Sequence, residues 1–129
     1  MFSTTFDPAS GAVIVEVDID GPNGRRRAKF LLDTGAYRTT VDVALTDDLG
    51  YGAHMGSRTT RAIGAGGPIQ GYLLKLQHIE LMGAAIEGFH IVCEDLDAEG
   101  SVDGLVGMDF LRGRVLTVDG IEGRVTLAP

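Results

Sequence analysis

The sequence predicts an all-β fold, a barrel or sandwich of about seven short strands with one or two short helices. Glycine supplies 19 of the 129 residues, roughly twice its usual share of about 7%. So many glycines indicate frequent tight turns and therefore short strands. Between these turns, apolar residues alternate with polar ones, as in strands with one buried face. No linker, low-complexity tract or repeat divides the chain, so residues 1–129 are expected to form one domain.

The first predicted element is a β-hairpin. Apolar residues alternate through residues 12–20, which is the period of a strand. These apolar residues are Val13, Val15, Val17 and Ile19. The turn sequence Gly-Pro-Asn-Gly follows at 21–24, and residues 27–32 are expected to return as the second strand.

A loop comes next, and a short helix is expected after it. Val41, Leu45 and Leu49 are spaced by four residues, so they would share one face of a helix that ends before Gly50. Residues 51–67 are rich in glycine and arginine and hold few large apolar side chains. This composition is typical of an exposed loop or a hairpin tip.

The second half of the chain is expected to hold further strands and one more helix. Apolar alternation predicts strand structure over residues 71–81 and 84–96. The candidate buried positions of the latter segment are Ile86, Phe89, Ile91 and Cys93. Residues 107–113 suit one short helix closed by its last glycine. Residues 114–129 are interpreted as a hairpin that turns at 119–123.

Charge and cysteine content argue against several classes of partner. The net charge is −7, so phosphate is repelled and no nucleic-acid partner is expected. The basic run Arg25–Arg27 is interpreted as the solvated start of a strand. No apolar stretch reaches the ~18 residues of a membrane span, and the N-terminus lacks the pattern of a cleavable signal. The lone Cys93 fits a reducing compartment, so a cytoplasmic protein with no membrane partner is expected.

No metal or organic cofactor is predicted. Residues 95–106 carry acids at the first, third and fifth positions and glycine at the sixth, as a calcium loop does. However, Val106 stands at the twelfth position in place of a bidentate glutamate, so a solvated acidic turn is the preferred interpretation. His54, His78 and His90 share no metal-ligand spacing.

One carboxylate is unusual in its position. Asp33 directly follows the apolar residues 30–32, at the end of what is predicted to be a buried strand. A charge there is costly unless it is hydrogen-bonded or shared. Asp before Thr-Gly is also common in ordinary loops, where the carboxylate accepts backbone N–H bonds. These residues alone therefore allow both a structural and a reactive role.

The motifs LLDTGA at Leu31–Ala36 and GLVGMDFL at Gly104–Leu111, together with two further segments, resemble the retropepsin-like aspartic proteases. Leu31–Ala36, with the sequence LLDTGA, is similar to that family's active-site loop, as is the following Thr39–Val41. Gly104–Leu111, with the sequence GLVGMDFL, resembles the family's second signature, in which two apolar residues and a glycine precede a short helix. Residues 62–72 lie where the family has its glycine-rich flap, and residues 124–129 lie where a strand ends the domain.

The resemblance implies a small, closed β-barrel of the acid-protease type that works as a homodimer. Hydrolysis of peptides by this route needs two carboxylates that share one proton. Asp-Thr-Gly occurs once in the sequence, so one chain supplies half of the site, and a two-fold axis would bring two copies of Asp33 together. The implied activity is that of an aspartic endopeptidase that cuts an extended peptide or protein substrate without a cofactor.

The resemblance also implies roles for individual residues. Asp33 is the implied catalytic residue. The residues implied to support its loop are Thr34, Gly35 and Ala36. Those implied to form the flap are Ile63, Gly64, Ala65, Gly66 and Gly67. Those implied to pack beneath the loop are Val106, Gly107 and Asp109.

Two positions depart from the family's pattern. Tyr37 stands where many relatives carry a small or acidic residue, so a bulkier wall of the substrate site is expected. Some viral members pair an arginine of the second-signature helix with an acidic residue near the catalytic loop. Here Arg38 lies near the loop and Asp109 lies in the helix. We therefore expect an ion pair of reversed polarity between Arg38 and Asp109.

Two alternatives stay open from the sequence. A catalytically inactive retropepsin-like module, used for dimerisation or peptide binding, would carry the same segments. An unrelated monomeric β-barrel that binds a small apolar ligand would use Asp33 only to cap its own loop.

Overall fold

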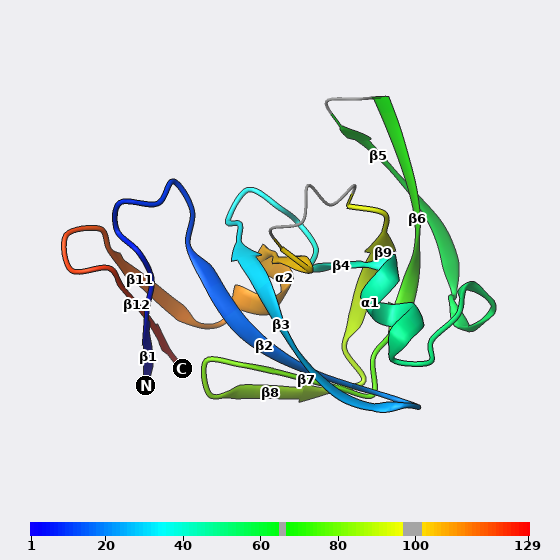
Figure 1. The fold of residues 1–129 in the computed structure, drawn as a ribbon, viewed down its shortest axis with the longest axis horizontal. Coiled ribbons are helices and arrows are strands. Elements are labelled where there is room, and N and C mark those ends of the chain that lie inside the picture. The colour runs from blue at the N-terminus through cyan, green and yellow to red at the C-terminus, as the bar shows by residue number, and fades with distance from the viewer. Residues whose placement is uncertain (65–66, 97–101) are drawn as a thin grey trace.

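The computed structural model of this chain describes residues 1–64, 67–96 and 102–129. Twelve strands are present in these residues (Figure 1). They are β1 (Phe2–Thr5), β2 (Ile14–Gly21), β3 (Gly24–Leu32), β4 (Thr40–Asp42), β5 (Arg58–Gly64), β6 (Gly67–Lys75), β7 (His78–Leu81), β8 (Ala84–Glu87), β9 (His90–Glu94), β10 (Gly104–Val106), β11 (Val115–Asp119) and β12 (Arg124–Ala128). The helical elements are α1 (Val43–Asp48), a 3₁₀ turn (Ala53–Met55) and α2 (Met108–Leu111). Among the described residues, no helix is long and apolar enough to cross a membrane.

The strands form two sheets. Nine of them pair in the order β5-β6-β9-β4-β10-β3-β2-β7-β8, and β1, β12 and β11 form a three-stranded sheet in that order. In Figure 1 the large sheet curls, the small sheet projects at one end with both termini beside each other, and the β5–β6 hairpin rises at the other end. The predicted all-β class with two short helices is confirmed.

The two hairpins expected near the ends of the chain are present. β2 and β3 pair antiparallel from Ile14 opposite Leu31 to Gly21 opposite Gly24, and β11 and β12 pair across the turn expected at 119–123. The apolar alternation of β2 corresponds to burial, because Val15, Val17 and Ile19 all belong to the core. Both hairpins therefore follow from local sequence alone.

The prediction of about seven strands is too low. Residues 71–81 hold the end of β6 and all of β7, because the chain leaves the ladder at residues 76–77. Residues 84–96 hold β8 and β9, separated at Gly88, whose φ is +67°. β1 lacks apolar alternation and was not expected. It is held by antiparallel pairing with β12 at the opposite end of the chain.

The core lies within the curled sheet and is closed by α2. Phe30 of β3 and Phe110 of α2 are its largest fully buried side chains. Phe110 meets Phe89 edge to face, with 5.8 Å between the ring centroids and an interplanar angle of 87°. Leu45 and Leu49 are buried as expected for one helical face, but Val41 belongs to β4 and not to the helix.

Candidate active site

The loop that carries Asp33 connects β3 to β4, and both of these strands pair with β10. β10 runs parallel to β3 and antiparallel to β4. A Cβ on Gly104 of β10 would lie 2.5 Å from the Phe30 ring and 2.5 Å from the Thr40 carbonyl oxygen. Real Cβ contacts do not come this close, so only glycine allows β10 to lie between the two strands. The two ends of the loop are therefore held by one shared neighbour.

The Asp33 side chain bonds within its own loop. Its Oδ1 accepts the Gly35 N–H at 2.9 Å, and its main-chain carbonyl accepts the Ala36 N–H at 3.2 Å. Asp33 is half-buried, whereas Thr34 and Gly35 are exposed. The loop thus presents a carboxylate near the surface, with one oxygen oriented by a backbone donor.

The second-signature segment lies against this loop. The Asp33 N–H donates to the Val106 carbonyl at 3.0 Å, and the Met108 N–H donates to the Ala36 carbonyl at 2.8 Å. Val106 and Gly107 are buried. The structure therefore brings together the residues that were implied to form the catalytic loop and those implied to support it.

Thr39 and Asp109 join the far end of the loop to α2. The Asp109 Oδ1 accepts the Thr39 N–H at 2.9 Å and the Thr39 hydroxyl at 2.8 Å. The same oxygen accepts the Phe110 N–H at 2.8 Å. The Gly107 N–H donates to Thr39 Oγ1 at 3.1 Å, and the Asp109 N–H donates to the Tyr37 carbonyl at 3.1 Å.

The ion pair expected between Arg38 and Asp109 is not formed in the single chain. None of the ion pairs between described residues involves Arg38. Asp109 lies at the start of α2, where its carboxylate reaches the Thr39 hydroxyl and two backbone N–H groups. Arg38 is exposed, and an exposed ion pair would add little stability against such bonds.

Thr39 belongs to a motif that resembles the family's active-site loop, but the sequence predicted no role for it. Its importance depends on a partner 70 residues away, and no local pattern reveals that distance. The signal that could have indicated this contact was Thr39, a hydroxyl residue shortly after Asp-Thr-Gly, together with Asp109, a carboxylate two residues after Gly107.

Of the residues implied to form the flap, Ile63, Gly64 and Gly67 lie at the end of the β5–β6 ladder. Gly64 pairs with Gly67 at the last position of its ladder, and Gly67 has φ +116°, a conformation that strains other residues. Ile63 lies one position earlier in β5. Ala65 and Gly66 lie outside the described residues. The expectation of an exposed loop or hairpin tip over residues 51–67 is wrong for Arg58–Gly64, which form β5 through their pairing with β6.

Tyr37 lies within the Asp33 loop and is 92% exposed. Its carbonyl is held by α2 through the Asp109 N–H, so the backbone is anchored while the ring lies in solvent. The expectation that Tyr37 forms a bulkier wall of the substrate site stays a prediction.

The histidines, Cys93 and the calcium-like segment were the other candidates for chemistry in the sequence. No group of three or more His, Cys, Asp or Glu residues there is placed to hold a metal ion, and the calcium-like segment 95–106 includes residues 97–101, which lie outside the described ones. Cys93 is buried in β9 as expected, with its sulfur 3.6 Å from the Thr46 hydroxyl oxygen. Burial raises the pKa of this thiol. His90 is exposed on the same strand.

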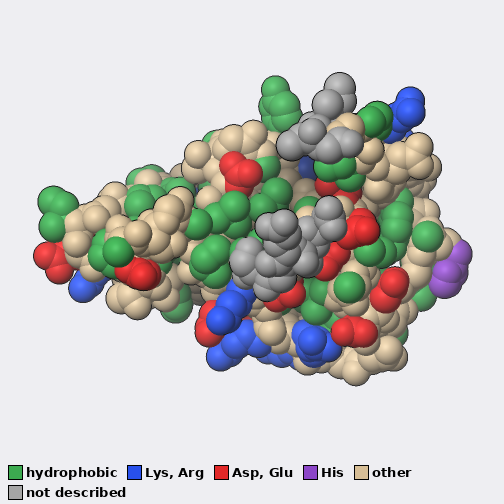
Figure 2. Space-filling view, turned by 45° about the horizontal axis from the view of Figure 1, so that its top comes forward, with side chains coloured by type: hydrophobic (Ala, Val, Ile, Leu, Met, Phe, Trp, Pro, Cys, Tyr) green, Lys and Arg blue, Asp and Glu red, His purple; other side chains and the backbone are tan. Residues whose placement is uncertain are grey.

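The basic run Arg25–Arg27 lies in β3 and is engaged by carboxylates. Arg25 pairs with Asp20 at 2.6 Å, and Arg27 pairs with Asp18 at 3.0 Å. The face drawn in Figure 2 shows acidic and basic side chains next to one another. Arginines held in this way are solvated strand residues, as interpreted from the sequence.

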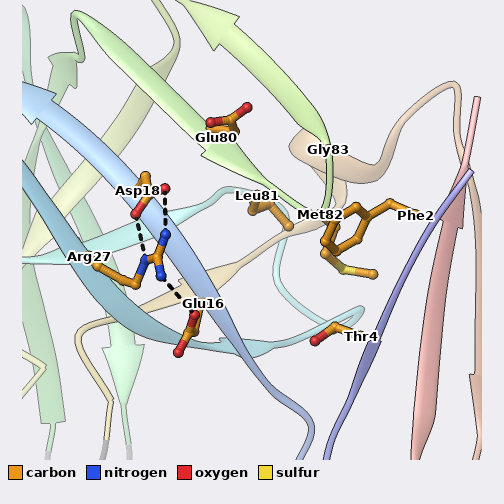
Figure 3. A pocket seen from close by; sticks show the side chains of 9 residues that line it. All are labelled: Phe2, Thr4, Glu16, Asp18, Arg27, Glu80, Leu81, Met82 and Gly83. Atoms are coloured by element: carbon orange, nitrogen blue, oxygen red, sulfur yellow. Dashed lines mark hydrogen bonds and ion pairs between the residues drawn. The ribbon is translucent and has the colours of Figure 1, made fainter.

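A cleft apart from the Asp33 loop opens between β1, β2 and β7 (Figure 3). Arg27 lies in it between Asp18 and Glu16, at 3.0 and 3.6 Å. Phe2 forms part of the apolar wall of the cleft. The cleft lies between the small sheet and the large one, and Glu80 lines it as a further acidic side chain beside the three paired charges.

Comparisons with known proteins bear on the same segments. A protein-family model described as aspartyl protease matches residues 15–110, which include β3, β10 and most of α2. A retropepsin-like aspartic protease from Rickettsia conorii is similar in structure, with a TM-score of 0.71 and 17% identity over 98% of this chain and 90% of that chain. The EIAV protease complexed with the inhibitor HBY-793 is also similar, with a TM-score of 0.59 and 23% identity over 84% of this chain and 92% of that chain. No curated protein matches the chain.

Proposed function

The chain belongs to the aspartyl protease family and has a retropepsin-like fold, and from this membership we propose that it is an aspartic endopeptidase whose site forms between the two protomers of a homodimer. Asp33 of each protomer would supply one of the two carboxylates. The observation that carries the proposal is the Asp33 loop, which presents one oriented, half-buried carboxylate per chain. Asp-Thr-Gly occurs once in the sequence, so pairing two loops is the way to obtain a dyad.

The chemistry of such a dyad follows from the repulsion between two like charges. Two carboxylates a few Å apart cannot both ionise at low cost, so they hold one proton between them. The ionised member takes a proton from a water molecule, which attacks the scissile carbonyl carbon. The neutral member donates its proton to the carbonyl oxygen. The amine then leaves with the proton that the first carboxylate took from water, and a hydroxyl of the tetrahedral intermediate returns a proton to the second carboxylate, so the dyad again holds one proton.

The β5–β6 hairpin is proposed as the flap. Its ladder ends at Gly64 and Gly67, and glycines allow the backbone to bend as a lid closes. Extended substrates bind to such sites through main-chain hydrogen bonds, with side chains in pockets on alternate sides. An extended peptide between this hairpin and the Asp33 loop is therefore the proposed substrate geometry.

The second candidate function is an inactive module that binds peptides or dimerises. Tyr37 is the observation that favours it, because a ring that is 92% exposed in the Asp33 loop could occupy the space of a substrate. The alternative of an unrelated β-barrel is excluded by the family to which the chain belongs.

Cleavage of a mixed peptide library at several acidic pH values tests the proposal. The wild-type protein is expected to cut, and Asp33→Ala is expected to lower the rate by more than about a thousandfold, as loss of a catalytic group does. Asp33→Asn keeps the shape of the side chain and is expected to be equally inactive. Cleavage by Asp33→Asn at the wild-type rate would contradict the mechanism. Peptide binding without cleavage by the wild type would favour the inactive module.

Activity is also expected to depend on pH as a shared proton requires. The rate should be highest on the acidic side of neutrality, where the dyad holds one proton, and fall as the second carboxylate ionises. A rate that stays constant to well above neutral pH would speak against a carboxylate dyad.

A further inference from the structure

Thr39 is a buried residue whose polar groups all have partners. Its exposed fraction is 0%. Its N–H and hydroxyl donate to the Asp109 Oδ1, its hydroxyl oxygen accepts the Gly107 N–H, and its carbonyl accepts the Val92 N–H at 3.0 Å. Breaking any of these bonds would leave a buried polar group without a partner, so the network resists displacement.

Asp109 binds the catalytic loop at two points. Its carboxylate oxygen accepts both donors of Thr39, and its N–H donates to the Tyr37 carbonyl. A charged acceptor makes hydrogen bonds roughly twice as strong as a neutral one does. The side chain of Asp109 is therefore the part of α2 that holds the far end of the loop.

The loop and the second-signature segment touch backbone to backbone. A Cβ on Gly107 would lie 2.6 Å and 2.7 Å from the carbonyl carbon and oxygen of Arg38, and 2.9 Å from the Thr39 nitrogen. The residue before Gly107, Val106, accepts the N–H of Asp33. A shift of Thr39 against this segment would therefore move the loop relative to β10, whose Val106 carbonyl accepts the Asp33 N–H.

We propose that Asp109 is a positioning residue, which acts through Thr39 to fix the orientation of the Asp33 loop. This proposal rests on the proposed protease activity, and it gives Asp109 a role other than an ion pair with Arg38. A displacement of about 1 Å at a reacting group can cost about a hundredfold in rate. Loosening this contact is therefore expected to lower kcat while KM changes little.

Asp109→Ala and Asp109→Asn form the first test. Asp109→Ala removes the acceptor and is expected to lower kcat by about 10- to 100-fold, with KM changed by less than about threefold. Asp109→Asn keeps an oxygen acceptor at the same place and is expected to recover most of kcat. Equal loss in both variants, or a wild-type kcat in Asp109→Ala, would overturn the positioning role.

Two threonines with buried hydroxyls provide a matched control. Thr39→Val is expected to lower kcat as Asp109→Ala does, and the double variant should be no worse than either single one, since both break the same contact. Thr46 of α1 is also 0% exposed, and its hydroxyl donates to the Val43 carbonyl at 3.1 Å. Thr46→Val should lose stability and keep kcat per folded molecule. Additive losses in the double variant would contradict a shared contact.

Amide hydrogen exchange reports on the same contact without any substrate. The Gly35 and Ala36 N–H groups are bonded to Asp33, and Asp109→Ala is expected to speed their exchange by more than about tenfold, while β2 amides stay protected. If the wild type cuts no peptide but this exchange changes as expected, the proposed function fails and the role of Asp109 in holding the loop stands. If the wild type is active and Asp109→Ala alters neither kcat nor exchange, the positioning role fails alone.

Discussion

At the scale of single residues, the site depends on two glycines that let backbones approach one another. Gly104 lets β10 lie between β3 and β4, and Gly107 lets the second-signature segment touch residues 38 and 39. Neither glycine has a positive φ. Their role is therefore to leave space, and any side chain at either position would push the Asp33 loop away from its support.

Gly104→Ala is expected to destabilise the protein. The added Cβ would lie 2.5 Å from the Thr40 carbonyl oxygen, a backbone atom that cannot rotate away, and overpacking of this kind costs about 1–3 kcal/mol or more. Urea unfolding measures the change. Gly120→Ala is the control, because a Cβ there meets nothing within 4 Å and should change stability by less than about 0.5 kcal/mol. Equal midpoints for the two variants would contradict this packing.

Cys93 is expected to resist thiol reagents in the folded protein. Cys93 is 1% exposed, and burial raises the pKa of its thiol. Little reactive thiolate therefore forms at a pH of about 8.5, where a free cysteine is half ionised. Labelling at pH 8 should be slow without denaturant and complete in denaturant. Rapid labelling of the native protein would show that β9 is not packed as described.

At the scale of elements, the sequence pattern predicts the hairpins whose two strands follow one another along the chain. The β2–β3 and β11–β12 hairpins were predicted because turn and strands are contiguous. β1 was missed because its partner is β12, and the Ser3 and Thr126 hydroxyls that bond at 2.8 Å are 123 residues apart. The loop of Asp33 and the segment of Asp109 were each recognised by motif. Their actual contact through Thr39 was not, because motif order carries no atomic distances.

Tyr51 links β2 to the segment just before β7, two parts of the chain that are far apart in sequence. Its hydroxyl donates to the Asp20 carbonyl of β2 and accepts the Gln77 N–H at 2.9 Å, just before β7. Tyr51→Phe would remove two part-buried hydrogen bonds, and at about 0.5–1.5 kcal/mol for each bond it is expected to cost about 1–3 kcal/mol. Thermal or urea unfolding measures the loss. Tyr37→Phe removes a hydroxyl from an exposed ring and should leave stability unchanged, so similar losses in both would refute the connecting role.

At the scale of the whole molecule, the proposed dimer must overcome its own charge. Each chain carries −7, so two chains carry 2 × −7 = −14. At 0.1 M salt, repulsion between exposed charges that are more than about 10 Å apart is largely screened. Association is therefore expected to strengthen as salt rises from very low concentration, and sedimentation measures it. An association that weakens steadily with salt would indicate that attraction between opposite charges dominates the interface.

The central claim is that one active site needs Asp33 from two chains, and mixed dimers test it most directly. Wild-type and Asp33→Asn chains are refolded together in equal amounts, and the rate is compared with that of the same total amount of wild type. Random pairing makes about one quarter of the dimers wild type on both sides. The account predicts about a quarter of the wild-type rate, because mixed dimers lack one carboxylate of the dyad. A rate of about one half would mean that each chain works alone, and would contradict the account.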